Sequence, residues 1–164
     1  MERMLHVLKT YPFSLTKIYY FSYKTSPGEA KEAIKRALKQ GYRHIDNADC
    51  YGNAKEISDG IKESNIPREK LFITSKLWVT YHDHVEEAID KILKELDTNY
   101  LDLLLIHFPT PLRYIPEGTS TVKYPKTGDG KLDAVNIPLE QTWKDMEEYG
   151  IRSGKVRSVC VMFY

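Results

Sequence analysis

The stretch Gly41–Asn53 reads Gly-Tyr-Arg-His-Ile-Asp-Asn-Ala-Asp-Cys-Tyr-Gly-Asn, and it decides the fold of this chain. Its apolar start, Tyr42–Ile45, predicts a short strand that ends at the carboxylate of Asp46. Tyr51 follows five residues later in a polar loop, and a helical pattern comes next. A carboxylate at the end of a strand and a tyrosine in the next loop indicate an acid–base pair at one rim of a parallel α/β sheet.

Strand-like and helix-like segments alternate along the chain. The predicted strands are Lys17–Tyr23, Tyr42–Asp46, Lys70–Leu77, Leu101–Ile106 and Val156–Val161. The predicted helices between them run from Pro27 to Gln40, Ala54 to Ser64, Val85 to Leu96 and Pro138 to Tyr149. This alternation predicts βαβ units and a parallel sheet, and the nearly continuous apolar strands predict burial on both faces.

The segments between these elements carry their own signals. Ser26 is the predicted N-cap of the first helix, with Pro27 as its first residue, and Gly41 suits the left-handed position after its end. Pro109–Asn136 is rich in Pro, Gly and Thr and is longer than an ordinary connection. We therefore expect it to be either a functional loop or disordered.

Three predicted strands end in residues that can transfer or direct a proton: Asp46 with Tyr51 close behind it, Lys76, and His107. The carboxyl ends of parallel strands meet at one rim, so we expect these four side chains to converge. A tyrosine hydroxyl has a reference pKa near about 10. An adjacent ammonium would favour the phenolate and lower that pKa, and a buried lysine needs a counter-charge. The set predicts a tuned acid that protonates an oxygen as charge develops there.

Four motifs, in order and in register, resemble the aldo-keto reductase superfamily over about residues 27–161. Gly41–Asp46 with Tyr51 is similar to its first signature. The other three are Leu71–Trp78, which resembles its lysine strand, Tyr100–Pro109, which resembles its histidine strand, and Trp143–Glu148 with Gly154–Ser158, which resemble the segment leading into strand five.

The resemblance implies a TIM (β/α)8 barrel, here a partial barrel of about five parallel strands and four helices. It implies NAD(P)H-dependent reduction of an aldehyde or ketone, with NADPH as the expected cofactor and a small carbonyl compound as the substrate. The implied catalytic residues are Tyr51 as general acid, Lys76 and Asp46 to tune it, and His107 to orient the carbonyl. The implied binding residues are His107, Trp78 and Phe108 for the substrate, and Asp46 for the cofactor.

Several positions depart from the family pattern. Ala54 stands where Glu is usual, Ser58 where Gly is usual, and Phe108 where Trp is commoner. The family's Gly-Thr-Trp of strand one has no counterpart before Thr25, and the Ser-Asn pair that contacts the nicotinamide is missing after Val159. The counterparts of strands six to eight are missing too.

These departures bear on what the chain is. We expect a divergent segment over residues 1–24, which can include strand one, and a partial oxidoreductase domain over residues 25–164. We expect a truncated or alternative product, or an incomplete gene model, whose exposed barrel edges favour oligomerisation. The alternative function is that of a catalytically inactive fragment that acts as an interaction module.

Composition excludes several other classes of function. Lys and Arg number 24 and Asp and Glu 23, so no excess charge indicates a nucleic-acid or anionic membrane partner. No apolar run approaches the roughly 18 residues of a membrane helix. Cys50 and Cys160 lie far apart and predict reduced thiols in a cytoplasmic protein. His82-Asp83-His84 does not predict a metal site, because histidines two positions apart at a helix start do not face one way.

Overall fold

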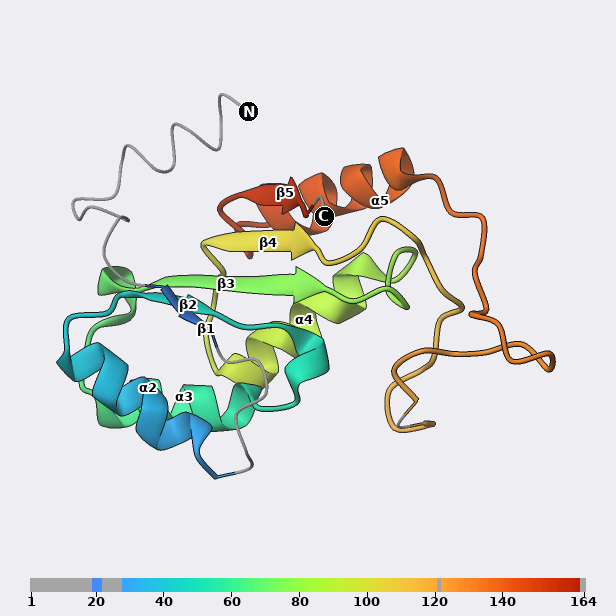
Figure 1. Cartoon of the computed structure of the whole chain (residues 1–164). Coiled ribbons are helices and arrows are strands. Elements are labelled where there is room, and N and C mark those ends of the chain that lie inside the picture. The colour runs from blue at the N-terminus through green and yellow to red at the C-terminus, as the bar shows by residue number, and fades with distance from the viewer. Residues whose placement is uncertain (1–18, 22–27, 121, 163–164) are drawn as a thin grey trace.

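The computed structural model describes residues 19–21, 28–120 and 122–162, and its centre is a parallel sheet (Figure 1). The five strands are β1 (Tyr19–Phe21), β2 (His44–Asp46), β3 (Phe72–Leu77), β4 (Leu103–Ile106) and β5 (Val159–Val161). Their order in the sheet is their order in the chain, and every neighbouring pair is parallel. Consecutive parallel strands require a crossover between each pair, and each of these crossovers contains a helix.

The helices are α2 (Ala30–Lys39), α3 (Ala54–Glu63), α4 (Val85–Leu96) and α5 (Leu139–Asp145), with a π-helical continuation η3 (Met146–Arg152). Two single-turn helices, η1 (Asp49–Tyr51) and η2 (Arg68–Lys70), lie in the loops. Neighbouring helices pack in chain order, α2 on α3, α3 on α4 and α4 on η3. The predicted partial barrel of five parallel strands and four α-helices is confirmed.

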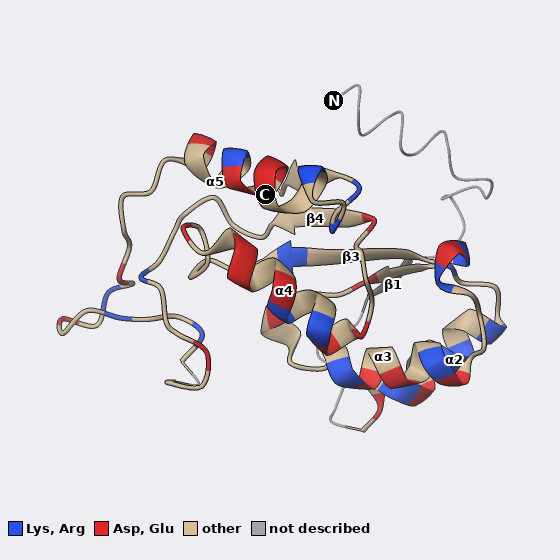
Figure 2. Ribbon diagram, turned by 180° about the vertical axis from the view of Figure 1, so that it is seen from behind, with Lys and Arg blue, Asp and Glu red and all other residues tan. Residues whose placement is uncertain are grey.

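The apolar stripe of α4 explains how a helix attaches to this sheet. All its large apolar side chains are buried, namely Val85, Ile89, Ile92, Leu93 and Leu96. Each such side chain contributes roughly 1.5–3 kcal/mol when it leaves water. The outer faces of α2, α3 and α4 carry the Lys, Arg, Asp and Glu residues (Figure 2). Among the described residues, no helix is long and apolar enough to cross a membrane.

Element boundaries differ from the prediction mainly at their beginnings. Helix α2 begins at Ala30, and the predicted cap, Ser26 and Pro27, lies outside the described residues. The carboxylate of Glu56 in α3 accepts hydrogen bonds from the backbone N–H of Gly28 (2.9 Å) and of Ala30 (3.1 Å). A neighbouring helix therefore binds the exposed amides at the start of α2, a contact that local sequence does not reveal.

The end of α2 follows the prediction. Gly41 has a φ of +95° and its N–H donates to the carbonyl of Leu38, as expected after a helix end. The strands that follow begin later than predicted, with β2 starting at His44 instead of Tyr42. At the other end of the chain, η3 extends the last helical segment to Arg152, beyond the predicted Tyr149.

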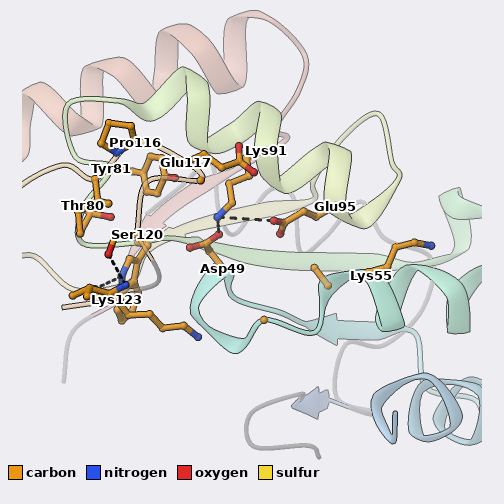
Figure 3. Close-up of a pocket in the computed structure, with 16 residues that line it drawn as sticks. Asp49, Lys55, Thr80, Tyr81, Lys91, Glu95, Pro116, Glu117, Ser120 and Lys123 are labelled. Carbon is orange, nitrogen blue, oxygen red and sulfur yellow. Dashed lines mark hydrogen bonds and ion pairs between the residues drawn. The ribbon is translucent and has the colours of Figure 1, made fainter. Parts of the chain in front are cut away.

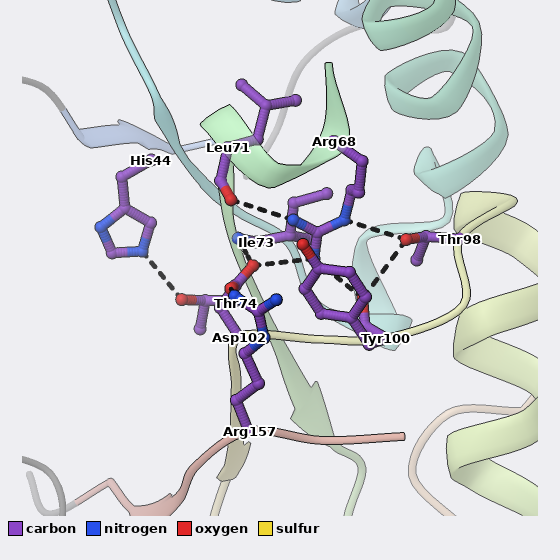
Figure 4. A network of polar contacts seen from close by, with 9 residues as sticks. All are labelled: His44, Arg68, Leu71, Ile73, Thr74, Thr98, Tyr100, Asp102 and Arg157. Atoms are coloured by element: carbon purple, nitrogen blue, oxygen red, sulfur yellow. Dashed lines mark hydrogen bonds and ion pairs between the residues drawn. The ribbon is translucent and has the colours of Figure 1, made fainter. Parts of the chain in front are cut away.

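A buried carboxylate ties together the amino-terminal ends of the last three strands (Figure 4). Asp102 is fully buried, and it accepts hydrogen bonds from Arg68 (2.7 Å), Arg157 (3.2 Å) and the N–H of Ile73 (2.9 Å). The ring of Tyr100 lies between the two guanidinium groups, 3.9 Å from Arg68 and 4.0 Å from Arg157. The attraction between each guanidinium and the face of the Tyr100 ring adds to the stabilisation from the ion pairs with Asp102.

We predict that Asp102→Asn lowers the free energy of unfolding by about 3 kcal/mol, because removing one partner of a buried ion pair leaves the other charge uncompensated. Chemical denaturation followed by circular dichroism measures the effect. Asp129→Asn is the matched control, since Asp129 lies on an exposed loop where it contacts Lys131. Equal stability of the two variants would contradict this role for Asp102.

Candidate active site

The four side chains predicted to converge do so at the carboxyl-terminal end of the sheet. Asp46 is the last residue of β2, Lys76 lies near the end of β3, and His107 directly follows β4. Tyr51 closes η1, the single helical turn after β2. Parallel pairing of β2, β3 and β4 places these residues at the same rim, although Asp46 and His107 lie far apart in the chain.

The ammonium of Lys76 is the centre of the site. It donates hydrogen bonds to the Asp46 carboxylate, to the carbonyl oxygen of Asn47 (3.0 Å) and to the Tyr51 hydroxyl (3.3 Å). Lys76 and Asp46 are each 1% exposed. The pair is therefore shielded from water, where a charge contact acts more strongly than at the surface.

His107 lies beside the tyrosine. Its ring centre is 6.3 Å from that of Tyr51, edge to face, and its Nδ1 lies 3.9 Å from the Cys50 sulfur. Burial, and after it the charge of Lys76, lower the pKa of His107 to about 4, against a smaller opposing effect from Asp49. The imidazole is therefore neutral at pH 7, and it has one nitrogen that donates and one that accepts.

Aromatic side chains form the wall next to His107. Phe108 stacks on the imidazole with ring centres 4.9 Å apart and planes 7° apart. Trp78 meets both rings at their edges, at 5.1 Å from His107 and 6.1 Å from Phe108. The rings of Trp78, His107 and Phe108 thus form an aromatic wall beside the Lys76 ammonium and the Tyr51 hydroxyl. This wall excludes water from one side of the site.

The long loop after β4 folds back over this rim. The indole N–H of Trp78 donates to the carbonyl oxygen of Lys123 (2.8 Å), and the Lys123 ammonium donates to the carbonyl oxygen of Cys50. The ring of Tyr124 lies 5.0 Å from that of Trp78. The sequence predicts either a functional loop or disorder for this segment, and its described part contacts the rim residues Trp78 and Cys50. Sequence reasoning missed Lys123 and Tyr124, because they belong to no motif.

Comparison with known proteins agrees with this geometry. The model of the aldo/keto reductase family matches residues 19–164. This chain belongs to the aldo/keto reductase family. It is 39% identical over 157 residues to an NAD(P)H-dependent D-xylose reductase of Candida tenuis and 41% identical over 158 residues to a D/L-glyceraldehyde reductase of Hypocrea jecorina. These alignments cover 90% and 91% of this chain but 48% and 46% of the relatives.

A solved structure shows the same fold. The aldose reductase of Schistosoma japonicum superposes with a TM-score of 0.80 at 39% identity, over 87% of this chain and 48% of that one. The five-stranded sheet is therefore part of an aldo/keto reductase TIM barrel. The chain spans about half the length of the relatives that it matches.

Two family positions that differ in sequence lie on α3. Ala54 is the first residue of α3 and is buried. Its methyl group makes no polar contact at the position where the family usually has Glu. Ser58 is buried on the same helix, and its hydroxyl has no hydrogen-bond partner among the described residues. A buried hydroxyl without a partner costs about 1–3 kcal/mol, and the family's usual Gly avoids that cost.

A pocket of about 450 Å³ adjoins the aldo/keto reductase rim (Figure 3). It lies between η1, α4 and the long loop, and Trp78 and Lys123 line both the pocket and the rim. Inside it, Lys91 of α4 forms an ion pair with Asp49 and lies 3.9 Å from Glu95. The pocket is thus a neighbour of the site, and Lys91 is matched there by two carboxylates.

We predict that His107 titrates with a pKa of about 4 in NMR spectra of its ring protons. The unfolded chain would bind this proton near the ordinary value of 6.5, so the free energy of unfolding falls as pH falls from 6.5 to about 4. Lys76→Met removes a cation that disfavours imidazolium and raises the pKa of His107. A midpoint near the ordinary value in the unaltered chain would contradict the buried, cation-facing environment.

Proposed function

We propose that this chain carries the proton-transfer half of a carbonyl-reducing site and supports NAD(P)H-dependent reduction of an aldehyde or ketone to an alcohol. The observation that carries the proposal is the single buried ammonium of Lys76, which contacts both the Asp46 carboxylate and the Tyr51 hydroxyl. This contact joins a lysine, an aspartate and a tyrosine from three separate segments, and it sets a phenol beside an ammonium at the rim.

Tyr51 is the proposed general acid. The hydrogen bond from Lys76 uses a lone pair of the phenol oxygen, so the phenol keeps its own proton for transfer. When that proton moves to the substrate oxygen, the ammonium 3.3 Å away stabilises the phenolate left behind. Asp46 keeps the ammonium charged in a site that excludes water. Proton transfer from a positioned group contributes typically about 10²–10⁴-fold in rate.

His107 is proposed to orient the substrate. A neutral imidazole can donate one hydrogen bond to the carbonyl oxygen without competing for the proton that Tyr51 delivers. Trp78 and Phe108 pack around the imidazole and present apolar surface to the rest of the substrate. The aromatic wall positions the carbonyl group of the substrate, while Tyr51 and His107 act on its oxygen.

The cofactor implied by the family fits this end of the site. NAD(P)H, when bound, supplies the hydride, and a phenol held by an ammonium supplies the proton that the reduced oxygen then needs. The proposed cofactor contacts in this chain are Asp46, at the rim, and the adjacent Asn47. The Asn47 side-chain oxygen is buried and has no hydrogen-bond partner among the described residues, so it can accept from a bound group.

The proposed substrate class is a small hydroxylated aldehyde. It is supported by the relatives named for D-xylose and glyceraldehyde reduction, and NADPH is the proposed cofactor. A cytoplasmic location is also proposed, because Cys50 and Cys160 are both free thiols, as a reducing compartment requires.

We predict that Tyr51→Phe lowers kcat for NADPH-dependent reduction of a generic aldehyde by at least about 100-fold, because the phenyl ring has no proton to give. Loss of cofactor absorbance measures turnover. Tyr149→Phe is the matched control, since Tyr149 is exposed and distant in sequence from the rim residues. Equal rates in the two variants would refute Tyr51 as the acid.

The same preparation tests the alternative function. Fluorescence titration with NADPH reports cofactor binding, and light scattering reports the oligomeric state. Saturable NADPH binding with turnover that depends on Tyr51 supports the enzyme. A folded oligomer that neither binds NADPH nor reduces aldehydes contradicts it and favours an interaction module.

A further inference from the structure

His82 is a buried titratable residue that the proposed chemistry does not use. It lies in the loop between β3 and α4, and its exposed fraction is 0%. Its Nε2 lies 3.1 Å from the carbonyl oxygen of Phe108, and its Nδ1 lies 3.1 Å from the Thr142 hydroxyl. His82 therefore joins the loop after β3, the segment that follows β4, and α5.

The partners of His82 decide which ring nitrogen carries the hydrogen. A carbonyl oxygen only accepts, so Nε2 carries the hydrogen and donates it to Phe108. Nδ1 is then an acceptor that faces the hydroxyl of Thr142 at 3.1 Å, and the single hydrogen of that hydroxyl is shared between Nδ1 and the carbonyl oxygen of His82 itself (3.0 Å). Burial lowers the pKa of His82, so the ring is neutral at pH 7 and keeps this tautomer.

The carbonyl that His82 holds belongs to a residue of the substrate wall. The rings of Phe108 and His107 stack with their planes 7° apart, although the two residues are adjacent in the chain. Side chains of adjacent residues in an extended segment point to opposite sides, so this stacking needs a turned backbone between them. Two hydrogen bonds hold the backbone of this pair at its two ends. The backbone N–H of His107 donates to the carbonyl of Leu77 (3.1 Å), and the carbonyl of Phe108 accepts from His82.

We propose that His82 is a positioning residue of the site: its hydrogen bond to the Phe108 carbonyl fixes the plane of the His107–Phe108 stack, and so the direction in which His107 presents its ring to a carbonyl substrate. The substrate part of this inference rests on the proposed function. The geometric part does not, because the environment of the His107 ring can be measured without turnover.

Two substitutions separate this role from simple packing. In His82→Gln the amide nitrogen reaches the place of Nε2 and can still donate to Phe108, whereas in His82→Asn the amide reaches only the place of Nδ1. We expect His82→Asn to shift the His107 ring signals in NMR spectra and to lower kcat/KM for an aldehyde by about tenfold, with NADPH affinity unchanged. His82→Gln should restore both the signals and the rate. Thr142→Val, which keeps the Phe108 contact, should leave the His107 signals in place.

The outcomes are distinct. Unchanged His107 signals in His82→Asn would overturn the inference, and so would an equal loss of rate in the Gln and Asn variants. If His82→Asn does not fold, imidazole nitrogen spectra of the unaltered chain decide: a hydrogen on Nε2 of His82 supports the inference, and one on Nδ1 overturns it. Absence of turnover in the unaltered chain would count against the proposed function alone, since the His107 signals still test the positioning.

Discussion

A buried ammonium is the constraint on which the rest of this structure depends. Lys76 is 1% exposed, and a lysine in such a place stays charged only if an opposite charge and further acceptors surround it. Asp46, Asn47 and Tyr51 meet that need. They do so only when β2 and β3 pair in one register, with Ile45 opposite Ile73. The requirement that stabilises the charge therefore also aligns the strands and places the tyrosine.

A second buried charge, the carboxylate of Asp102, joins the strands at the other end of the sheet. Asp102 binds Arg68, Arg157 and the backbone of Ile73, which belong to three separate segments. The two charged clusters lie near opposite ends of β3 and β4, and between them β4 is wholly apolar whereas β3 carries the buried hydroxyls of Thr74 and Ser75. One end is closed by a carboxylate between arginines, and the other presents an ammonium to a phenol. In the second arrangement the ammonium of Lys76 donates a hydrogen bond to the phenol oxygen of Tyr51, at the rim of the sheet.

The aromatic wall links this chemistry to the loops. Trp78, His107 and Phe108 contact one another directly. Each also makes a hydrogen bond to a residue of another segment: Trp78 to Lys123, His107 to Leu77 and Phe108 to His82. The long loop reaches Trp78 through Lys123, and the loop before α4 reaches Phe108 through His82. The positions of the wall therefore depend on loops that come before and after it in the chain. Rigid placement of this kind is what a site needs to hold a reacting group within a fraction of an ångström.

The sequence by itself determined the alternation of strands and helices, the ends of the strands and the residues found there. The apolar stripe from Val85 to Leu96 falls on α4, and the strand ends at Asp46, Lys76 and His107 predicted which side chains would meet. These features are local or repeat at fixed spacing, so each leaves a pattern in a short window. The family's motifs made the same residues recognisable, and the family match over residues 19–164 agrees.

Only the tertiary structure decided the contacts between segments that share no pattern. Glu56 caps a helix other than its own, Lys123 folds a loop over the rim, and His82 holds the residue beside His107. Each of these contacts joins residues 26 or more positions apart, and each depends on a single side chain, from a neighbouring helix for Glu56 and from a loop for Lys123 and His82. No window of sequence contains both partners, and a charge or an imidazole alone does not indicate where its partner lies. Packing of the whole sheet is what brings them together.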